Sequence, residues 1–379
     1  MRRPHVAALP LLALLALTAC SPAATEPTPS ATAPRPTPSA TASEPAPTPT
    51  ASAAPLPTTP ETFADGLAAP WSIVFAGDSV LVSERDSGRI VEIAPDGSTR
   101  DVATIGGVQH GGEGGLLGLA LHNSSLYVYS TAADGNRVER YLLRGGSGSW
   151  SLSEPTTVID GLPAANVHNA GRIAFGPDGK LYVPVGDAGD RPASQDPDAL
   201  NGKILRLEPD GSVPDDNPTP GSPVYSLGHR NVQGLAWDEQ GRLFASEFGQ
   251  NTWDELNIIQ PGGNYGWPVV EGRAGRDGYV DPIAQWQTRQ ASPSGIAIID
   301  GVVVIANLRG QVLRAVSADE PTRTADRYAG EYGRLRDVTI GPDGAIWILT
   351  NNTDGRGDPR RDDDRILRVD PAEVTSGLS

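Results

Sequence analysis

The chain has 379 residues, enough for one large domain or two, and a formal net charge of −16 at pH 7. The acidic balance argues against nucleic acid as a partner, because nucleic-acid binding needs a basic face. Cys20 is the only cysteine, which excludes an intrachain disulfide. The composition therefore favours a soluble exported domain, with most acidic residues solvated at its surface.

Residues 1–20 have the pattern of a secretory signal. Arg2 and Arg3 precede the apolar run VAALPLLALLALTA, which is too short to span a bilayer comfortably. LTAC at 17–20 resembles a bacterial lipobox, in which cleavage leaves the cysteine as a lipidated N-terminus. We therefore expect an exported protein held at the outer face of the bacterial cell membrane by a lipid on Cys20, with no other membrane contact.

Residues 21–60 consist almost entirely of Pro, Ala, Ser and Thr. This composition has no periodic apolar face and cannot bury enough surface to offset the entropy of ordering the chain. It predicts an extended, disordered tether that holds the following domain away from the surface.

A repeated unit fills residues 61–373, and helical periodicity is absent there. Each unit is an apolar strand, a short turn, a second apolar strand, another turn, and a strand of alternating basic and apolar residues. The copies begin at Pro70, Gly115, Gly171, Asn231, Pro293 and Leu335. In the third copy the closing strand is delayed to GKILRLEPDG at Gly202.

Short strands with a period of about 40 to 60 residues predict an all-β fold, a six-bladed β-propeller with about four antiparallel strands per blade. A sandwich or a parallel β-helix is the alternative, although a β-helix has a much shorter period. The strand near 62–67 is expected to join a neighbouring blade and close the ring, which removes exposed sheet edges. The Pro-Asp-Gly turns should lie on one face and the functional loops on the other.

Three stretches at blade entrances are candidates for a ligand pocket: GHRNVQG at 228–234, SEFGQNTWDELN at 246–257 and GRLRD at 333–337. The first places a histidine, an arginine and an asparagine beside glycines that let a ligand approach. The second offers carbonyls and carboxylates suited to calcium. The third puts Arg334 and Arg336 on one face of a strand, where two guanidiniums suit an anion. Taken singly, each also fits a capped turn, a solvated loop or a surface arginine pair.

Two other stretches are interpreted as structural. GGEGGLLG at 111–118 lacks the Lys-Ser/Thr pair of a phosphate-binding loop and fits a turn that enters the second unit. DGRGDPRRDDDR at 354–365 lacks the spacing of a calcium loop, and its mixed Asp and Arg residues are typical of a solvated surface loop.

Taken together and in order, the motifs resemble the glucose/sorbosone dehydrogenase family, over about residues 63–371. They are PWSIVF, GEGGLLGLAL, HNAGRIAFGPDGKLYVPVGD, LNGKILRL, GHRNVQGLAW, SEFGQNTWDELN, GGNYGWP and RLRDV. Members are soluble six-bladed propellers that bind pyrroloquinoline quinone (PQQ) and calcium and oxidise sugars. The resemblance implies an aldose dehydrogenase that hands its electrons to an external acceptor.

The resemblance also implies roles for individual residues. His168 matches the general base that takes the proton of the anomeric hydroxyl, a task that suits an imidazole. Arg230 and Asn231 match quinone contacts, and Arg334 and Arg336 match partners of the cofactor carboxylates. Arg309, in NLRGQ, stands where glucose-specific members have a lysine, so the charge is kept.

Two calcium positions follow from the same comparison, and they are separate sites. The carbonyls of Gly249 and Gln250 match the ligands of the calcium that polarises the quinone. Glu255 and the carbonyl of Tyr265 match a second, structural calcium position.

This sequence also departs from the glucose-type pattern. Glu113 stands near the cofactor in place of a glutamine, where a carboxylate would repel an anionic quinone unless it is protonated or paired. Phe248 replaces a polar residue beside the calcium loop, and Asn166 and Val167 replace an acidic neighbourhood. Two alternatives to the dehydrogenase stay open: a non-enzymatic propeller that serves as a binding module, and a calcium-dependent lactonase.

Overall fold

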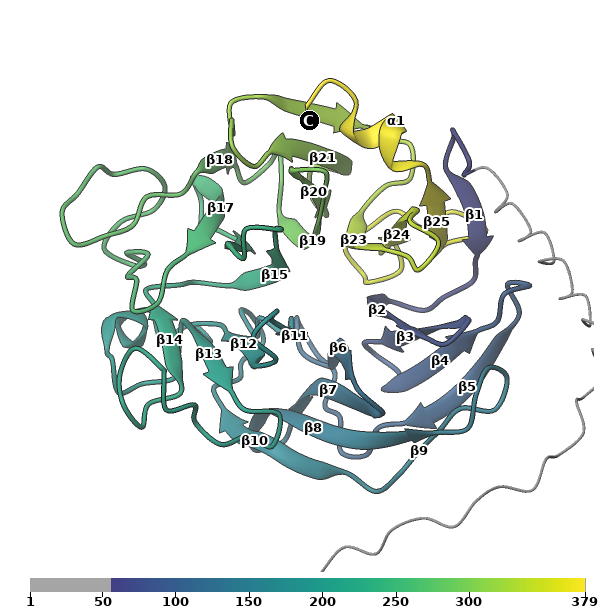
Figure 1. Ribbon diagram of the computed structural model, residues 1–379, viewed down its shortest axis with the longest axis horizontal. Helices are drawn as coiled ribbons and strands as arrows, with labels where there is room; N and C mark the ends of the chain where they lie inside the picture. Colours follow the sequence, from purple (N-terminus) through teal and green to yellow (C-terminus); the bar gives the residue numbers. More distant parts are fainter. Residues whose placement is uncertain (1–55, 379) are drawn as a thin grey trace, which may run out of the picture. The chain divides into compact units, whose positions relative to one another are not determined.

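The computed structural model describes residues 56–378, which form six β-sheets arranged around a central axis (Figure 1). The predicted six-bladed propeller is confirmed. The predicted signal segment, Cys20 and nearly all of the predicted tether lie outside the described residues. Among the described residues, no helix is long and apolar enough to cross a membrane.

In each blade neighbouring strands are antiparallel, and they follow one another from the axis outward in chain order. There are two exceptions: a short extra strand pairs beside the main path of the second blade, and the outermost strand of the last blade comes from the start of the described chain. The first blade contains β2 (Pro70–Ala76), β3 (Ser79–Glu84), β4 (Arg89–Ile93) and β5 (Thr99–Thr104). The second contains β6 (Leu116–His122), β7 (Ser125–Ala132), β8 (Gly135–Arg144), β9 (Ser151–Leu152) and β10 (Thr156–Leu162). The third contains β11 (Ala174–Phe175), β12 (Leu181–Val185), β13 (Lys203–Leu207) and β14 (Val224–Leu227).

The remaining blades follow the same order. The fourth blade contains β15 (Val232–Trp237), β16 (Leu243–Glu247), β17 (Trp253–Ile259) and β18 (Ala284–Gln287). The fifth contains β19 (Pro293–Ile299), β20 (Val302–Asn307), β21 (Val312–Ser317) and β22 (Thr324–Arg327). The sixth contains β23 (Leu335–Ile340), β24 (Ile346–Thr350), β25 (Ile366–Val369) and β1 (Glu61–Ala64).

The ring closes between the two ends of the described chain. β1 pairs antiparallel with β25, with Glu61 opposite Arg368, so the N-terminal strand completes the last blade. The predicted closure by the strand near 62–67 is thereby confirmed. Phe63, Phe75 and Trp347 pack edge-to-face at the seam between the last blade and the first, which buries apolar surface where the two chain ends meet.

The core lies between neighbouring blades, because each sheet is covered on one face by the preceding sheet of the ring and on the other face by the following sheet. One cluster of buried side chains contains Tyr127 and Val138 from the second blade and Val183 and Leu205 from the third. Residues on both faces of the inner strands are therefore apolar, so the sequence shows apolar runs in place of strict alternation.

Antiparallel order assigns the loops to two faces. Turns between the first and second, and the third and fourth, strands of a blade lie on one face; all other loops lie on the opposite face. The Pro-Asp-Gly turns at 95–97, 177–179, 209–211 and 342–344 all belong to the first group. The predicted candidate stretches all belong to the second group, so they share one face of the ring.

Two short helical segments interrupt the strand pattern, although the sequence predicted none. The 3₁₀ helix η1 (Pro192–Gln195) lies in the long β12–β13 loop, and α1 (Pro371–Thr375) follows the last strand. Asp370 caps α1 by accepting a hydrogen bond from the Ala372 N–H. Helices this short have too few residues to produce a periodic signal in the sequence.

Candidate functional site

His168 lies in the connection between β10 and β11, in a strained backbone conformation with φ of +58°. Three contacts determine this conformation. The His168 N–H donates to Glu113 Oε2 at 2.7 Å, and the Ala170 N–H donates to Asn231 Oδ1 at 2.9 Å. The His168 carbonyl packs so closely on Gly186 that any Cβ at that position would overlap it.

Both nitrogens of the His168 imidazole have partners. Nδ1 lies 2.6 Å from Asp187 Oδ1, and Nε2 lies 2.8 Å from the Arg230 guanidinium. A carboxylate only accepts and a guanidinium only donates, so these partners assign the proton to Nδ1 and the lone pair to Nε2. The side chain is 14% exposed, so the imidazole is oriented yet reachable.

Asp187, two residues after β12, is a fully buried carboxylate that orients His168. Burial alone raises the pKa of Asp187, but donation from His168, the Gly189 N–H and the Trp267 indole outweighs burial and holds the pKa below its usual range. The carboxylate therefore stays charged and keeps the imidazole in one tautomer.

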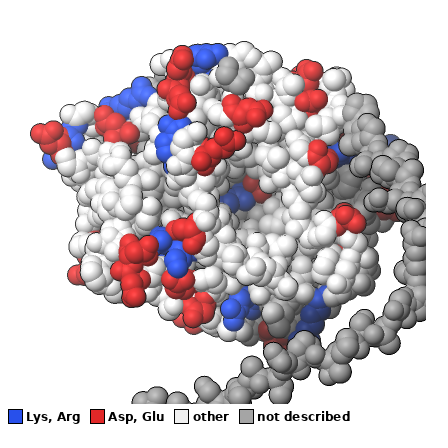
Figure 2. All heavy atoms as spheres, in the orientation of Figure 1, with Lys and Arg blue, Asp and Glu red and all other residues white. Residues whose placement is uncertain are grey.

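A cavity of about 320 Å³ adjoins this histidine at the centre of the ring, where charged side chains are visible inside the central hollow (Figure 2). Two of its lining residues connect the cavity to His168. Glu113 accepts a hydrogen bond from the His168 N–H, and the Phe248 carbonyl accepts one from Arg230, the residue that donates to the imidazole. The charged side chains that line the cavity are one carboxylate, that of Glu113, and five arginines: Arg85, Arg309, Arg334, Arg336 and Arg356.

The predicted arginine pair lies at the base of this cavity, and both side chains are buried. Burial lowers the pKa of Arg336; the charge of Asp354 opposes this, and the neighbouring guanidiniums, Arg334 first, lower the pKa further. The buried Arg334 Nε has no hydrogen-bond partner among the described residues. Excess positive charge and an unpaired donor are the physical signs of an anion site.

The loop at 354–365, which was predicted to be plain surface, contributes to the cavity, so that prediction is wrong. Asp354 is buried, and its carboxylate lies 2.9 Å from Arg334 and 3.9 Å from Arg336. Arg356 lines the cavity. The loop folds inward because Asp364, also buried, accepts hydrogen bonds from the backbone N–H groups of Asn352 and Thr353.

The predicted conflict at Glu113 is resolved by pairing. Its Oε2 accepts from the His168 N–H, while its Oε1 lies 3.3 Å from the Arg356 guanidinium. Asn231 is fully buried beneath the same loop, where its amide supports Ala170. Arg309 is exposed at the cavity wall and forms no ion pair with any described residue.

The loop between β16 and β17 wraps around one carboxylate that the sequence did not single out. Glu271 Oε1 accepts from the consecutive backbone N–H groups of residues 250–253. Within residues 56–378, the carbonyls of Gly249 and Gln250 accept no hydrogen bond. These two carbonyls are therefore available as oxygen ligands for a hard cation.

Glu255 and Tyr265 lie outside the cavity, on the same side of the ring. Glu255 on β17 is directly opposite Glu247 on β16. Burial, followed by the charge of Glu247, raises the pKa of Glu255 to about 8. No cluster of three or more His, Cys, Asp or Glu side chains forms a metal site within the described part of the chain, so a cation here would need carbonyl ligands as well.

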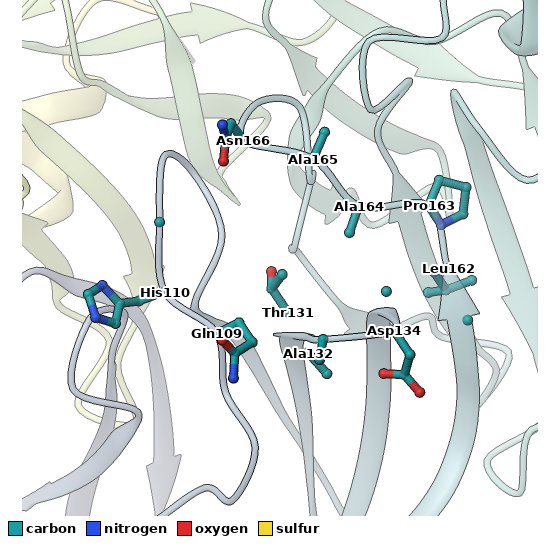
Figure 3. Close-up of a pocket in the computed structure, with 14 residues that line it drawn as sticks. Gln109, His110, Thr131, Ala132, Asp134, Leu162, Pro163, Ala164, Ala165 and Asn166 are labelled. Atoms are coloured by element: carbon teal, nitrogen blue, oxygen red, sulfur yellow. The ribbon is translucent and has the colours of Figure 1, made fainter.

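A second cavity, of about 490 Å³, lies beside Asn166, among the loops that precede β6, join β7 to β8 and follow β10 (Figure 3). Gln109, His110, Thr131 and Asp134 surround it, and Ala164 to Asn166 form its other wall. It is larger than the arginine cavity, but no arginine or lysine lines it. The chemistry therefore points to the smaller cavity.

Sequence reasoning missed Asp187, Trp267 and Glu271. Asp187 comes two residues after the buried strand β12, directly after a glycine, a position that could have marked it as a site residue. Trp267 belongs to the motif GGNYGWP but was given no role. Glu271 carries no local signal, since its partners are backbone N–H groups about 20 residues earlier.

The sequence profile described as Glucose / Sorbosone dehydrogenase matches residues 67–367. The chain belongs to the glucose/sorbosone dehydrogenase family. Its structure resembles that of the PQQ-bound aldose sugar dehydrogenase from Streptomyces coelicolor, with 47% identity, a TM-score of 0.77 and coverage of 83% of this chain and 99% of that one.

Two curated members of the glucose/sorbosone dehydrogenase family are more distant. An aldose sugar dehydrogenase of Escherichia coli is 29% identical, with the match spanning 84% of this chain and 94% of that protein. Quinoprotein glucose dehydrogenase B of Acinetobacter calcoaceticus is 31% identical over 66% of this chain, and the match spans 64% of that enzyme's length.

Proposed function

We propose that this protein is a PQQ- and calcium-dependent dehydrogenase that oxidises the anomeric carbon of an aldose sugar at His168. One observation carries the proposal: an imidazole oriented by a buried carboxylate lies next to a cavity with an unbalanced positive charge. Family membership and the PQQ-bound Streptomyces relative support it. The proposal includes an external electron acceptor and export to the cell surface with a lipid anchor.

The cavity fits a compact polyanion such as PQQ, which has three carboxyl groups. Arg334 and Arg336 would hold carboxylates at the base. Within residues 56–378 the Arg334 Nε lacks a partner, and Asp354 is the one carboxylate that forms an ion pair with these two arginines. Arg309 offers a further guanidinium at the wall. Arg230 is partly buried beside the cavity; this burial lowers the pKa of Arg230, and Asp187 opposes the effect.

When bound, PQQ would supply a quinone that accepts hydride, and calcium would polarise that quinone as a Lewis acid. The chain's own contribution is the proton transfer. His168 Nε2 accepts the proton of the anomeric hydroxyl as the anomeric C–H bond gives up its hydride, and the sugar becomes a lactone. Arg230 must release Nε2 at this point, because one lone pair cannot serve both groups.

Asp187 then stabilises the imidazolium that His168 becomes. Its charge is already desolvated and hydrogen-bonded before substrate arrives, so no rearrangement of solvent is needed during the step. The Glu113 bond to the His168 backbone N–H holds the segment that carries the imidazole. The proton can leave later, after the sugar product has dissociated.

Calcium has two supported positions in this proposal. The Gly249 and Gln250 carbonyls, which face no competing donor among the described residues, would bind the ion beside the quinone. Glu255 and the Tyr265 carbonyl would bind the structural ion, which would neutralise the buried pair of Glu255 and Glu247.

The test is dye-coupled aldose oxidation by purified protein supplied with PQQ and calcium, normalised to bound PQQ. His168→Gln should bind PQQ and keep its melting temperature but lose about 10²- to 10⁴-fold in turnover. A loaded His168→Gln variant with near wild-type turnover would refute the role of His168. A wild-type protein that binds no PQQ would favour a non-enzymatic binding module, and lactone hydrolysis without PQQ would favour a lactonase.

A further inference from the structure

The indole of Trp267 contacts both groups that hold the His168 imidazole. Its Nε1–H donates to Asp187 Oδ2 at 2.8 Å, and the other oxygen of Asp187 is the one bound to His168 Nδ1. The Arg230 guanidinium carbon lies 5.4 Å from the indole centroid, and Arg230 is the donor to His168 Nε2. One side chain therefore reaches both imidazole nitrogens, each through a single intermediary.

The backbone fixes this indole in place. Trp267 is buried, its N–H donates to the Gly228 carbonyl at 2.9 Å, and its carbonyl accepts from Gln195 at 2.7 Å. Gly228 is two residues before Arg230, so the segment that carries the indole is hydrogen-bonded to the segment that carries the guanidinium. Gln195 belongs to η1, in the same loop as Asp187.

We propose that Trp267 is a positioning residue for His168: it holds Asp187 and Arg230 so that the imidazole keeps its Nδ1–H tautomer and its orientation. This inference rests on the proposed role of His168 as the base. It assigns no contact between Trp267 and substrate or cofactor, so its signature must appear in the behaviour of His168.

Loss of the indole N–H should change the protonation of His168 in a defined direction. Asp187 would lose one of its donors, so more of its negative charge would be directed at His168 Nδ1–H. A less compensated carboxylate favours the imidazolium and raises the pKa of His168. A looser Asp187 would also let the ring move, and a misplacement of about 1 Å can cost about 10² in rate.

Several other charged groups lie near His168, Asp187 and Arg230, and a Trp267→Phe variant alters none of them. Glu113 contacts the His168 backbone, Glu247 accepts from the Arg230 backbone N–H, and Glu271 acts on Arg230 through its charge. The Arg191 guanidinium lies 5.6 Å from the indole centroid. Phenylalanine keeps an aromatic ring for both arginines, so the variant isolates the lost N–H.

Trp347 supplies a matched control on the opposite face of the ring. Its Nε1–H also donates to a carboxylate, Asp343, at 3.1 Å, and its ring also carries a guanidinium, that of Arg368, at 5.3 Å. Trp347→Phe therefore removes the same kind of bond at a blade seam and costs comparable stability. It lies among Pro-Asp-Gly turns, far from the loops that carry His168.

The experiment is a histidine NMR titration of the metal-free apoprotein, with the His168 signal assigned by its loss in His168→Gln. In Trp267→Phe the His168 pKa should rise by about 0.5 or more. With PQQ and calcium, turnover should fall about 10- to 100-fold, and the acidic limb of kcat/KM should move to higher pH. Trp347→Phe should show neither change.

An unchanged His168 titration together with unchanged turnover in Trp267→Phe would overturn the proposal. If that variant does not fold, the wild-type protein decides: the Trp267 indole N–H signal should follow the His168 titration with the same midpoint, and a signal that stays flat would overturn the proposal. Because the titrations need no PQQ, an inactive wild-type enzyme would refute the proposed function and still leave this inference testable.

Discussion

Glu255 gives the chain a pH-dependent stability that calcium should remove. This carboxyl is buried opposite Glu247, and burial, followed by that neighbouring charge, raises its pKa from 4.5 to about 8. Hydrogen bonds from Asn257 and the Gly272 N–H offset only part of this effect. Between pH 4.5 and 8, the folded protein therefore holds a proton that the unfolded chain releases.

The sign follows from proton linkage. Where the folded state binds more protons, the free energy of unfolding falls as pH rises, by about 1.4 kcal/mol per pH unit for one group. Metal-free protein should therefore lose roughly 3 to 4 kcal/mol between pH 5 and pH 8 through Glu255. Burial also raises the pKa of Asp254, to about 6, which adds a smaller loss that does not depend on Glu255.

The assay is urea unfolding at pH 5 and pH 8, with a chelator and with calcium, for wild type and Glu255→Gln. The amide cannot ionise, so the variant should lose most of the pH dependence and most of the stabilisation by calcium. Glu239→Gln, at an exposed position, is the control and should match wild type. A variant with the full wild-type pH dependence would show that Glu255 is not its source, and full calcium stabilisation would remove Glu255 from the ion site.

Two further predictions concern the walls of the site. Asp354→Asn should lower the stability of the apoprotein by about 3 kcal/mol, because it removes the carboxylate that offsets Arg334 and Arg336. PQQ should raise the melting temperature of this variant more than that of wild type, and an equal rise would contradict the charge argument. Gly186→Ala should displace His168 and lower turnover at least about 10²-fold, because its Cβ would overlap the His168 carbonyl. Gly106→Ala, where a Cβ meets open space, should be unaffected, and a fully active Gly186→Ala would show that the loop adapts.

The sequence by itself was enough to predict the architecture, because blades are local. Most strands pair with the next strand along the chain, so apolar runs separated by turn residues are enough to indicate the fold. The long-range closure by β1 was predicted as well, since a first unit that begins one strand late leaves one blade incomplete. His168, Arg334 and Arg336 were recognisable because their motifs are continuous in sequence.

Only the tertiary structure decided how distant charges are paired. The negative charge of Glu113 is tolerated beside an anion site because it is paired with Arg356, 243 positions later in the sequence. Asp354 is a buried counter-ion because the β23–β24 hairpin brings its loop back beside Arg334. The same holds for Trp267, whose indole meets Asp187 80 positions away. A local sequence window records the strands and turns of each blade, but the electrostatic environment of a propeller's axis is assembled from loops of every blade.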